Sequence, residues 1–329
     1  MTRSTRGLTG EILLTTNLSR VISDLVLGTM YFGTRTDKAT SLALLDRFVA
    51  AGGRTIDTAN CYAFWADPSG LGGQSESVIG EWLWLNPGIR DRLIISTKVG
   101  VQPVDGGLEG LSPDVVRHQA ARSRERLGVE AIDVHWAHGE DRSVPIEATA
   151  DAMGALVAEG VVRRLGMSNH PTWLLERARS HALRTGLEPF SAVQLTTSYL
   201  SPRPGAPVEG KDHRFGWVSE ETLDYAALHP EMEIWAYSPL IGGAYDRDDR
   251  HFPRAYQHSG TSDRLAVLAD LADRRGLTRG QVVLAWLLHR RPAIRPIVGV
   301  STLAQLDAAL GAAEVELEAE EMAQLDAPT

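Results

Sequence analysis

The alternation of strand and helix along this chain constrains its fold more than any other feature. Short apolar or β-branched runs, typical of buried strands, recur between segments whose apolar residues have helical spacing. The predicted strands lie near residues 25, 55, 93, 132, 162, 192, 233 and 297, and each is followed by a predicted helix. Eight such units predict an α/β protein with a parallel sheet. At 329 residues the commonest closed form of that sheet is a (β/α)8 TIM barrel.

Capping patterns support the later units of the barrel. Thr278 with Gln281, and Thr302 with Gln305, have the spacing of capping boxes, in which two side chains satisfy free backbone N–H groups. The first of these helices is expected to end at Pro292, because proline cannot continue a helix. The second is expected to be the last long helix of the chain.

The barrel is predicted to be a single domain covering residues 21–329. A chain of this length could hold two domains, but α/β barrels routinely exceed about 250 residues as one domain. Residues 1–20 are polar and contain two short strand-like pieces, at 12–15 and 20–22. These pieces favour a β-hairpin that lies outside the barrel.

Three connections are longer than usual, at residues 63–73, 201–218 and 242–260. All three follow predicted strands, and the carboxyl ends of barrel strands meet at one face of the molecule. Long loops on that face usually shape a pocket. Their aromatic content argues against disordered insertions. The aromatic residues concerned are Phe64, Trp65, Phe215, Trp217, Tyr245, Phe252 and Tyr256.

Composition excludes several classes of function. The net charge of −9, with no basic stripe, argues against a nucleic-acid partner. The longest apolar run, residues 282–288, is too short to span a membrane, and no apolar run typical of a secretion signal follows the early arginines. Cys61 is the only cysteine, which excludes intrachain disulfides and a multi-cysteine zinc site. A cytoplasmic enzyme or binding protein fits these features.

Two further patterns do not predict a site. Residues 205–211 match the start of a phosphate-binding loop, but Asp212 replaces the hydroxyl residue that would bind magnesium, and no Gly-x-Gly-x-x-Gly fingerprint occurs. His135 and His138 lie three apart on a predicted strand, so their side chains point to opposite faces and are not expected to share a metal. His135 is expected to be packed, and His138 to be available for chemistry.

Four polar side chains leave consecutive predicted strands at their carboxyl ends. Asp57 and Tyr62 follow the second strand, Lys98 the third and His138 the fourth. Each alone has a structural explanation; an Asp-Thr pair after a strand, for example, commonly forms a cap or turn. Their occurrence in consecutive units, on the face where such barrels catalyse, is hard to obtain by chance. They are the candidate catalytic residues, and no metal site is predicted.

The chain resembles the aldo-keto reductase superfamily from about Val21 to Leu325. Seven groups of residues carry this resemblance, and together they are highly specific. They are Leu27-Gly28-Thr29-Met30 with Phe32-Gly33, Ile56-Asp57-Thr58-Ala59 with Tyr62, Ser96-Thr97-Lys98, Ile132-Asp133 with His138 and Asp141, Gly166-Met167-Ser168-Asn169, Gln194, and Tyr237-Ser238-Pro239-Leu240.

The resemblance implies a catalytic tetrad of Asp57, Tyr62, Lys98 and His138 in a reductase of aldehydes or ketones. Hydride delivered to a carbonyl carbon leaves an alkoxide, which Tyr62 would protonate. An ordinary tyrosine, with a pKa of about 10, is a reluctant acid near neutrality. The ammonium of Lys98 is expected to lower the pKa of Tyr62. Asp57 would hold Lys98 charged, and His138 would orient the carbonyl.

The resemblance also implies an extended nicotinamide cofactor bound without a Rossmann fold. Ser168, Asn169 and Gln194 would hold the carboxamide, and Tyr237 would stack on the nicotinamide ring. The remaining expected cofactor contacts come from strand ends and the loops after them. They are Gly28, Thr29, Met30 and Asp57, then Ser238, Pro239, Leu240 and Gly242 at the pyrophosphate, and Gly299, Ser301 and Gln305 at the adenosine.

NADP(H) is expected to be preferred over NAD(H), by a smaller margin than is usual for the family. Residues 299–305 contain no lysine or arginine to hold the 2′-phosphate, and Ala308-Ala309 replace the usual Glu-Asn pair. An arginine from the loop at 242–260 could compensate; the candidates are Arg247, Arg250 and Arg254.

Departures from the family pattern affect the substrate pocket and leave the substrate open. Ala63 stands where a glycine is usual, the loop before Gln74-Ser75-Glu76 is long, and the residues from Gln194 read Gln-Leu-Thr-Thr-Ser-Tyr. Two alternatives remain. One is a cofactor-binding accessory protein with little turnover, like the barrel-shaped subunits of potassium channels. The other, a metal-dependent barrel hydrolase, lacks a cluster of His and carboxylate ligands.

Overall fold

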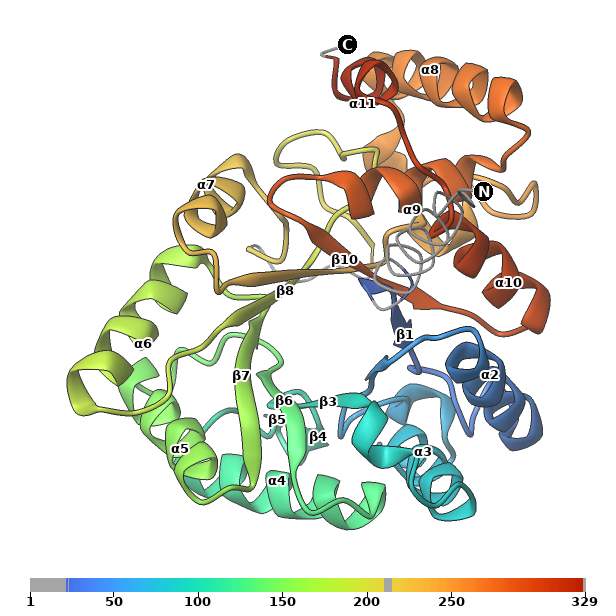
Figure 1. Ribbon diagram of the computed structural model, residues 1–329. Coiled ribbons are helices and arrows are strands. Elements are labelled where there is room, and N and C mark those ends of the chain that lie inside the picture. Colours follow the sequence, from blue (N-terminus) through green and yellow to red (C-terminus); the bar gives the residue numbers. More distant parts are fainter. Residues whose placement is uncertain (1–21, 23, 210–214, 328–329) are drawn as a thin grey trace, which may run out of the picture.

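Eight parallel strands form a closed barrel with helices around it (Figure 1). The computed structural model describes residue 22, residues 24–209 and residues 215–327. Around the barrel the strands follow the order β1-β10-β9-β8-β7-β6-β3-β2. Their bounds are β1 (Val26–Gly28), β2 (Thr55–Asp57), β3 (Ile94–Val99), β6 (Ile132–Ala137), β7 (Val162–Ser168), β8 (Ala192–Thr196), β9 (Glu233–Tyr237) and β10 (Ile294–Gly299). The predicted TIM barrel is confirmed.

Helices follow the strands and cover the outside of the barrel (Figure 1). Their bounds are α2 (Lys38–Ala50), α3 (Gln74–Leu85), α4 (Pro113–Leu127), α5 (Ile146–Ala158), α6 (Thr172–Thr185), α7 (Glu220–Leu228), α8 (Ser259–Arg275), α9 (Arg279–His289), α10 (Leu303–Ala312) and α11 (Ala319–Asp326). Short 3₁₀ turns interrupt the connections in the described residues: η1 (Phe64–Ala66), η2 (Arg90–Arg92), η3 (Ile241–Gly243) and η4 (Arg254–Tyr256).

Two strand predictions needed correction. The last barrel strand begins at Ile294, three residues before the predicted Ile297. Its start was predicted too late because the strand contains Pro296, and proline normally argues against a central strand. A small antiparallel hairpin, β4 (Pro103–Val104) with β5 (Gly107–Leu108), was not predicted. Its strands are too short to show alternation. The Asp105-Gly106 pair between them was the available signal, since such a pair favours a two-residue hairpin turn.

The predicted caps are confirmed for α9 and only half confirmed for α10. Thr278 and Gln281 form the reciprocal capping box at α9. At α10 the Thr302 side chain accepts from the N–H of Gln305, but the Gln305 amide oxygen accepts from the N–H of Ser301 instead, at 2.9 Å. The last long helix is in fact two helices, because Glu318 caps a new one, α11, which packs beside α8 (Figure 1).

The inside of the barrel is filled by side chains, as in a packed core. Buried Val26, Val134, Ala192 and Ile297 surround two tryptophans, Trp136 and Trp235, whose ring centroids lie 5.1 Å apart. Gly166 on β7 is required by this packing, since a Cβ there would lie 2.2 Å from the Trp136 ring. The filled interior leaves the strand ends as the place for chemistry.

Arg164, Glu233 and Arg295 form ion pairs at the amino-terminal end of the barrel. We call this cluster of three side chains the base. Glu233, at the start of β9, contacts Arg164 of β7 at 2.9 Å and Arg295 of β10 at 3.2 Å. The indole N–H of Trp235 donates to the same carboxylate at 2.8 Å. Arg295 also donates to the hydroxyl of Thr55 on β2. The base therefore links four strands through one cluster of charges.

The three long loops all leave the carboxyl ends of strands, as predicted: they follow β2, β8 and β9. The predicted hairpin in residues 1–20 and the end of the phosphate-loop match lie outside the described residues, so the hairpin and the domain boundary stay predictions. In the described part of the chain, none of the helices is long and apolar enough to cross a membrane.

Candidate active site

Lys98 joins Asp57 and Tyr62 at the carboxyl end of the barrel. Its ammonium lies 2.5 Å from the Asp57 carboxylate and 3.0 Å from the Tyr62 hydroxyl, and it also donates to the carbonyl of Thr58 at 2.7 Å. Lys98 and Asp57 are buried, whereas Tyr62 is half-buried. Of the four candidate catalytic residues, the structure therefore brings three into direct contact.

The strand register explains this contact. Asp57 ends β2 and is paired with Ser96 of β3. Side chains alternate along a strand, so Ser96 and Lys98 point to one side while Thr97 points to the other, where its hydroxyl donates to Glu76 of α3 at 2.6 Å. Ser96 donates to Asp57 at 2.7 Å. Sequence reasoning assigned Ser96 no role, although its two-residue spacing from Lys98 was a usable signal.

Burial acts on the ionisation of both Tyr62 and Lys98. It raises the pKa of the Tyr62 phenol well above its usual value, and the negative charge of Asp57 adds to this rise. Burial also lowers the pKa of Lys98, although the neighbouring Asp57 opposes that change. The net pKa of Tyr62 is therefore raised, whereas a lowered value was expected, and the largest cause is removal of the phenolate from water.

His138 lies beside the other three residues, just beyond β6. Its ring is 5.8 Å from the Tyr62 ring, edge to face at 76°, and its Nδ1 lies 3.6 Å from the sulfur of Cys61. Cys61 is buried, and burial raises the pKa of its thiol to about 12. The thiol thus stays protonated near neutrality. Sequence reasoning did not place Cys61 at this site.

His135 and His138 take the different positions expected of them. His135 is fully buried in β6, where burial lowers its pKa to about 4, while His138 is half-buried at the mouth of the barrel. Within the described ranges, no three His, Cys, Asp or Glu side chains gather in a way that could hold a metal ion.

Asn169 connects three strand ends around the mouth. Its amide nitrogen donates to the His138 carbonyl at 2.9 Å and to the Ser168 hydroxyl at 3.2 Å, and its amide oxygen accepts from the Tyr237 hydroxyl at 2.7 Å. Its backbone is left-handed, with φ of 61°, which asparagine tolerates better than most residues. Gln194 of β8 donates to Asp57 at 3.0 Å. The residues expected at the carboxamide thus gather around Asp57 and His138.

The segment after β9 contains several residues with positive φ. Ser238, Ile241, Gly242 and Gly243 all have positive φ, at 54°, 49°, 67° and 91°. A β-branched residue such as Ile241 rarely adopts this conformation, so the local backbone is strained. Strain of this kind concentrates at functional sites. The N–H groups of Ile241 and Gly243 donate to the carbonyls of Ser238 and Leu240 within the turn. The expected pyrophosphate contact of residues 238–242 stays a prediction.

The residues expected from β1 and the loop after it differ in what they can offer a cofactor. The Thr29 side chain is buried, and its hydroxyl bonds the Asp57 carbonyl and Ser75. Met30 is 36% exposed. Gly28 has no room for a side chain, because a Cβ would lie 2.9 Å from Ile297. The Thr29 hydroxyl is therefore already bonded within the fold, and its expected contact with a cofactor stays a prediction.

The segment after β10 is exposed at Gly299 and Ser301, and a Cβ on Gly299 would meet no atom within 4 Å. Ser301 donates to the Gln305 amide oxygen at 3.1 Å, so these two expected adenosine contacts are bonded to each other. Arg247, one of the arginines considered as compensation, is held instead by Asp249 through two hydrogen bonds, of 2.9 and 2.6 Å.

Aromatic side chains stand at the rim beside Tyr62. Trp65 meets Phe64 edge to face at 4.9 Å and Tyr31 at 6.2 Å. Trp65 is 44% exposed. The loop at 63–73 therefore brings a flat apolar surface next to the half-buried Tyr62.

Comparisons with known proteins agree with this geometry. The sequence model described as the Aldo/keto reductase family matches residues 24–328. The chain is 29% identical to norsolorinic acid reductase stcV of Emericella nidulans, with 93% of this chain and 78% of the relative covered. It is 33% identical to aldo-keto reductase str7 of Strobilurus tenacellus, with 79% and 75% covered.

Solved structures of similar fold include two aldo-keto reductases. The thermostable aldo-keto reductase Tm1743, solved with the inhibitor epalrestat, superposes with a TM-score of 0.70 at 26% identity, with 92% of this chain and 94% of that chain covered. An aldo-keto reductase from Klebsiella pneumoniae, solved with NADPH, superposes with a TM-score of 0.68 at 25% identity, with 92% and 89% covered.

Proposed function

We propose that this chain, which belongs to the aldo/keto reductase family, reduces an aldehyde or ketone to an alcohol. Tyr62 is the proposed proton donor. One observation carries the proposal: a single buried ammonium, that of Lys98, contacts both the Asp57 carboxylate and the Tyr62 hydroxyl. This arrangement stabilises the negative charge that Tyr62 acquires when it gives up its proton.

Tyr62 protonates the alkoxide. The raised pKa of Tyr62 keeps the phenol protonated before the reaction, so the acid is in the correct form at neutral pH. Lys98, 3.0 Å from the hydroxyl, then stabilises the phenolate, and Asp57 favours the charged form of Lys98. His138 hydrogen-bonds the carbonyl oxygen and directs it toward Tyr62, an arrangement that the 5.8 Å separation of their rings allows.

The residues at the mouth fit a nicotinamide cofactor, which when bound supplies the hydride. Ser168, Asn169 and Gln194 offer amide and hydroxyl groups of the kind a carboxamide needs. Tyr237, held by its hydrogen bond to Asn169, provides the ring for stacking. Residues 238–242 are proposed to line the pyrophosphate, as the family resemblance implies. NADP(H) is the proposed cofactor, in agreement with the Klebsiella pneumoniae structure that was solved with NADPH.

The rim favours a substrate whose carbonyl is attached to a flat apolar group. Phe64 and Trp65 follow Tyr62 directly, and their exposed faces would pack against an aromatic ring. An aryl aldehyde or ketone is therefore the proposed substrate class. Small sugars, which rely on hydrogen bonds, find fewer partners on this rim.

A matched panel of carbonyl compounds tests the proposal. Benzaldehyde and cyclohexanecarbaldehyde have the same carbon skeleton but differ in aromaticity, and glyceraldehyde represents small sugars. NADPH oxidation should be fastest with benzaldehyde, and deuterium placed at C4 of the cofactor should appear on the carbinol carbon of the product. Tight NADPH binding without turnover on any of the three would contradict the proposal and favour the accessory-protein alternative.

A further inference from the structure

The Asp57 carboxylate is held by donors from two other strands. Its Oδ2 atom contacts the Lys98 ammonium at 2.5 Å. Its Oδ1 atom accepts from the Ser96 hydroxyl at 2.7 Å and from the Gln194 amide nitrogen at 3.0 Å. Asp57 is buried, so these donors take the place of the water that would otherwise solvate the charge. The direction in which Oδ2 points therefore depends on what holds Oδ1.

The Ser96 hydroxyl is the more firmly placed of the two donors to Oδ1. Ser96 is buried in β3, where it is paired with Asp57 of β2 on one side and with Val134 of β6 on the other. Its side chain has fewer rotatable bonds than that of Gln194, so less conformational freedom is lost when the donor is fixed. The length of 2.7 Å is that of a charge-assisted O–H bond to a carboxylate.

Gln194 also has a second task in the proposed function, where its amide helps to hold the nicotinamide carboxamide. The Ser96 hydroxyl has no such task, because Asp57 is its only hydrogen-bond partner among the residues that the structure describes. Ser96 is therefore the donor that remains on Oδ1 wherever the Gln194 amide turns.

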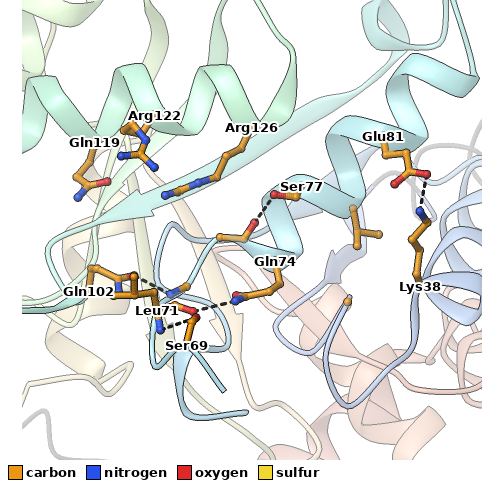
Figure 2. Close-up of a pocket in the computed structure, with 14 residues that line it drawn as sticks. Lys38, Ser69, Leu71, Gln74, Ser77, Glu81, Gln102, Gln119, Arg122 and Arg126 are labelled. Carbon is orange, nitrogen blue, oxygen red and sulfur yellow. Dashed lines mark hydrogen bonds and ion pairs between the residues drawn. The ribbon is translucent and has the colours of Figure 1, made fainter. Parts of the chain in front are cut away.

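Thr97, the next residue of β3, shows what a hydroxyl on the opposite side of the strand does. Thr97 is also buried, but its hydroxyl donates to Glu76 of α3 at 2.6 Å. The other oxygen of Glu76 contacts Arg126 at 2.8 Å, and Figure 2 shows Arg126 reaching from α4 toward the groove beside α3. Thr97 thus joins the barrel to its helices, whereas the Ser96 hydroxyl faces the candidate catalytic residues.

We propose that Ser96 is a positioning residue for carbonyl reduction, because its hydroxyl fixes the Asp57 carboxylate with Oδ2 toward Lys98. Lys98 is thereby kept on the Tyr62 hydroxyl, 3.0 Å away. This inference rests on the proposed function, in which Tyr62 gives its proton to the alkoxide. Ser96 acts through Asp57 and Lys98 and has no contact with the substrate. Its loss should slow the step that uses Tyr62 and leave binding unchanged.

Steady-state reduction of benzaldehyde with NADPH by the full chain tests this role. Ser96→Ala should lower kcat by about tenfold or more, the effect typical of a hydrogen bond to a charged group. The KM for benzaldehyde and the Kd for NADPH should stay within about twofold of the wild type. Ser96→Thr keeps the hydroxyl and should recover at least about half of the wild-type kcat. Unchanged kcat in Ser96→Ala would overturn the proposal, as would a Ser96→Thr variant that is stable and equally slow.

Thr97→Val is the matched control, because it removes a buried hydroxyl from the same strand that donates to Glu76. Its melting temperature should fall, while its kcat should stay within about twofold of the wild type. An equal fall in kcat for Thr97→Val would mean that any loosening of β3 slows the enzyme, and would overturn the assignment.

A double-mutant cycle shows whether Ser96 acts through Asp57. In an Asp57→Ala background, Ser96→Ala should change kcat by less than about twofold, since the group it positions is gone. A further fall of about tenfold in that background would contradict the proposal. The comparison with Ser96→Thr stands without this cycle.

Crystal structures of the wild type and of Ser96→Ala, each with NADP⁺, test the positioning without turnover. In the variant the Asp57 carboxylate should turn, and the Lys98 nitrogen should lie more than about 3.5 Å from the Tyr62 oxygen, beyond hydrogen-bonding range. An unchanged arrangement of these three side chains would overturn the proposal. If the wild type reduced no aldehyde, the proposed function would fail, and the two crystal structures would still decide whether Ser96 holds Asp57.

Discussion

The two ends of the barrel both hold clustered charges, but the clusters are built differently. At the base, Glu233 is shared by Arg164, Arg295 and the indole of Trp235, and its side chain is 32% exposed. At the mouth, the Lys98–Asp57 pair is 0% and 2% exposed and is bonded to a third group, the Tyr62 hydroxyl. The base joins strands to one another, whereas the mouth holds an acidic proton next to a cation.

This difference teaches what each end contributes. At the base, both carboxylate oxygens of Glu233 are already bonded, so this cluster stabilises the fold and has no free acceptor for a substrate. A buried ion pair costs desolvation energy and is weak evidence for stability on its own. The Lys98–Asp57 pair lies beside the half-buried phenol of Tyr62 at the open end of the barrel. We therefore attribute this pair to function. We therefore expect changes at the mouth to affect turnover and changes at the base to affect stability.

Tyr62→Phe should give the largest effect. Removal of the hydroxyl eliminates the proton donor while the ring remains, so turnover should fall by at least about a hundredfold, or about 2.7 kcal/mol. NADPH binding and thermal stability should change little. Tyr31→Phe is the control, because it removes a rim hydroxyl that bonds Arg35. A Tyr62→Phe enzyme with more than about a tenth of wild-type turnover would show that another group donates the proton.

His135, buried in β6 between the two ends, should make stability depend on pH. Its pKa is about 4 in the folded protein and about 6.5 in the unfolded chain, so acid favours the unfolded state. The stability it contributes is complete above about pH 6.5 and is lost as the pH falls toward 4, with about 2 kcal/mol lost by pH 5.

Urea unfolding at about pH 7.5 and pH 5 measures this effect. His135→Leu should lose about 2 kcal/mol less than the wild type over that interval, whatever its stability at pH 7.5. His181→Leu, at a half-buried position near the helix surface, should behave as the wild type does. Equal acid sensitivity in His135→Leu would show that other groups control it.

Glu233→Gln should break the base without disturbing the mouth. Loss of the charge leaves Arg164 and Arg295 close together without their shared carboxylate, and we expect the free energy of unfolding to fall by about 1.5 kcal/mol. Turnover at saturating substrate should remain within about twofold of the wild type. Glu159→Gln removes an exposed pair with Arg117 and should cost less than about 0.5 kcal/mol. If Glu233→Gln lost most of its turnover and kept its stability, the base would serve catalysis and the expected division between the two ends would be wrong.

The smallest expected effect concerns the choice of cofactor at the mouth. The ratio of kcat/KM for NADPH over NADH should be only about fivefold, or about 1 kcal/mol, because residues 299–305 have no cationic side chain and Arg247 is held by Asp249. Ser301→Arg should raise the ratio, while Thr302→Arg would also disturb the cap of α10. A clear preference of the wild type for NADH would contradict the proposed cofactor.

The residues at the strand ends could be predicted, because the alternation of strands and helices and the order of the strands determine which residues stand there. Asp57 ends its strand, Lys98 lies near the end of the next and His138 directly follows a third. Parallel strands in a closed barrel bring their carboxyl ends together. Tyr62 could be assigned to the same site from the sequence because it lies only five residues beyond Asp57. The hairpin of β4 and β5 was missed because two-residue strands show no periodicity, although the Asp105-Gly106 turn was visible.

Other features depend on atoms that are distant in sequence. Ser96 and Gln194 reach Asp57 from two different strands, and Asn169 reaches both His138 and Tyr237. The direction of the Tyr62 pKa shift was also beyond the sequence. It depends on how much water the fold removes from the phenol, and this burial is the largest cause of the raised pKa.

The sequence by itself determined the barrel and which residue types stand at its mouth, because both follow from local periodicity and from the order of the strands. Only the tertiary structure decided the partners of those residues, the burial that sets their pKa values and the positive-φ turn after β9. Distances between separate elements depend on packing, and packing is a property of the whole chain.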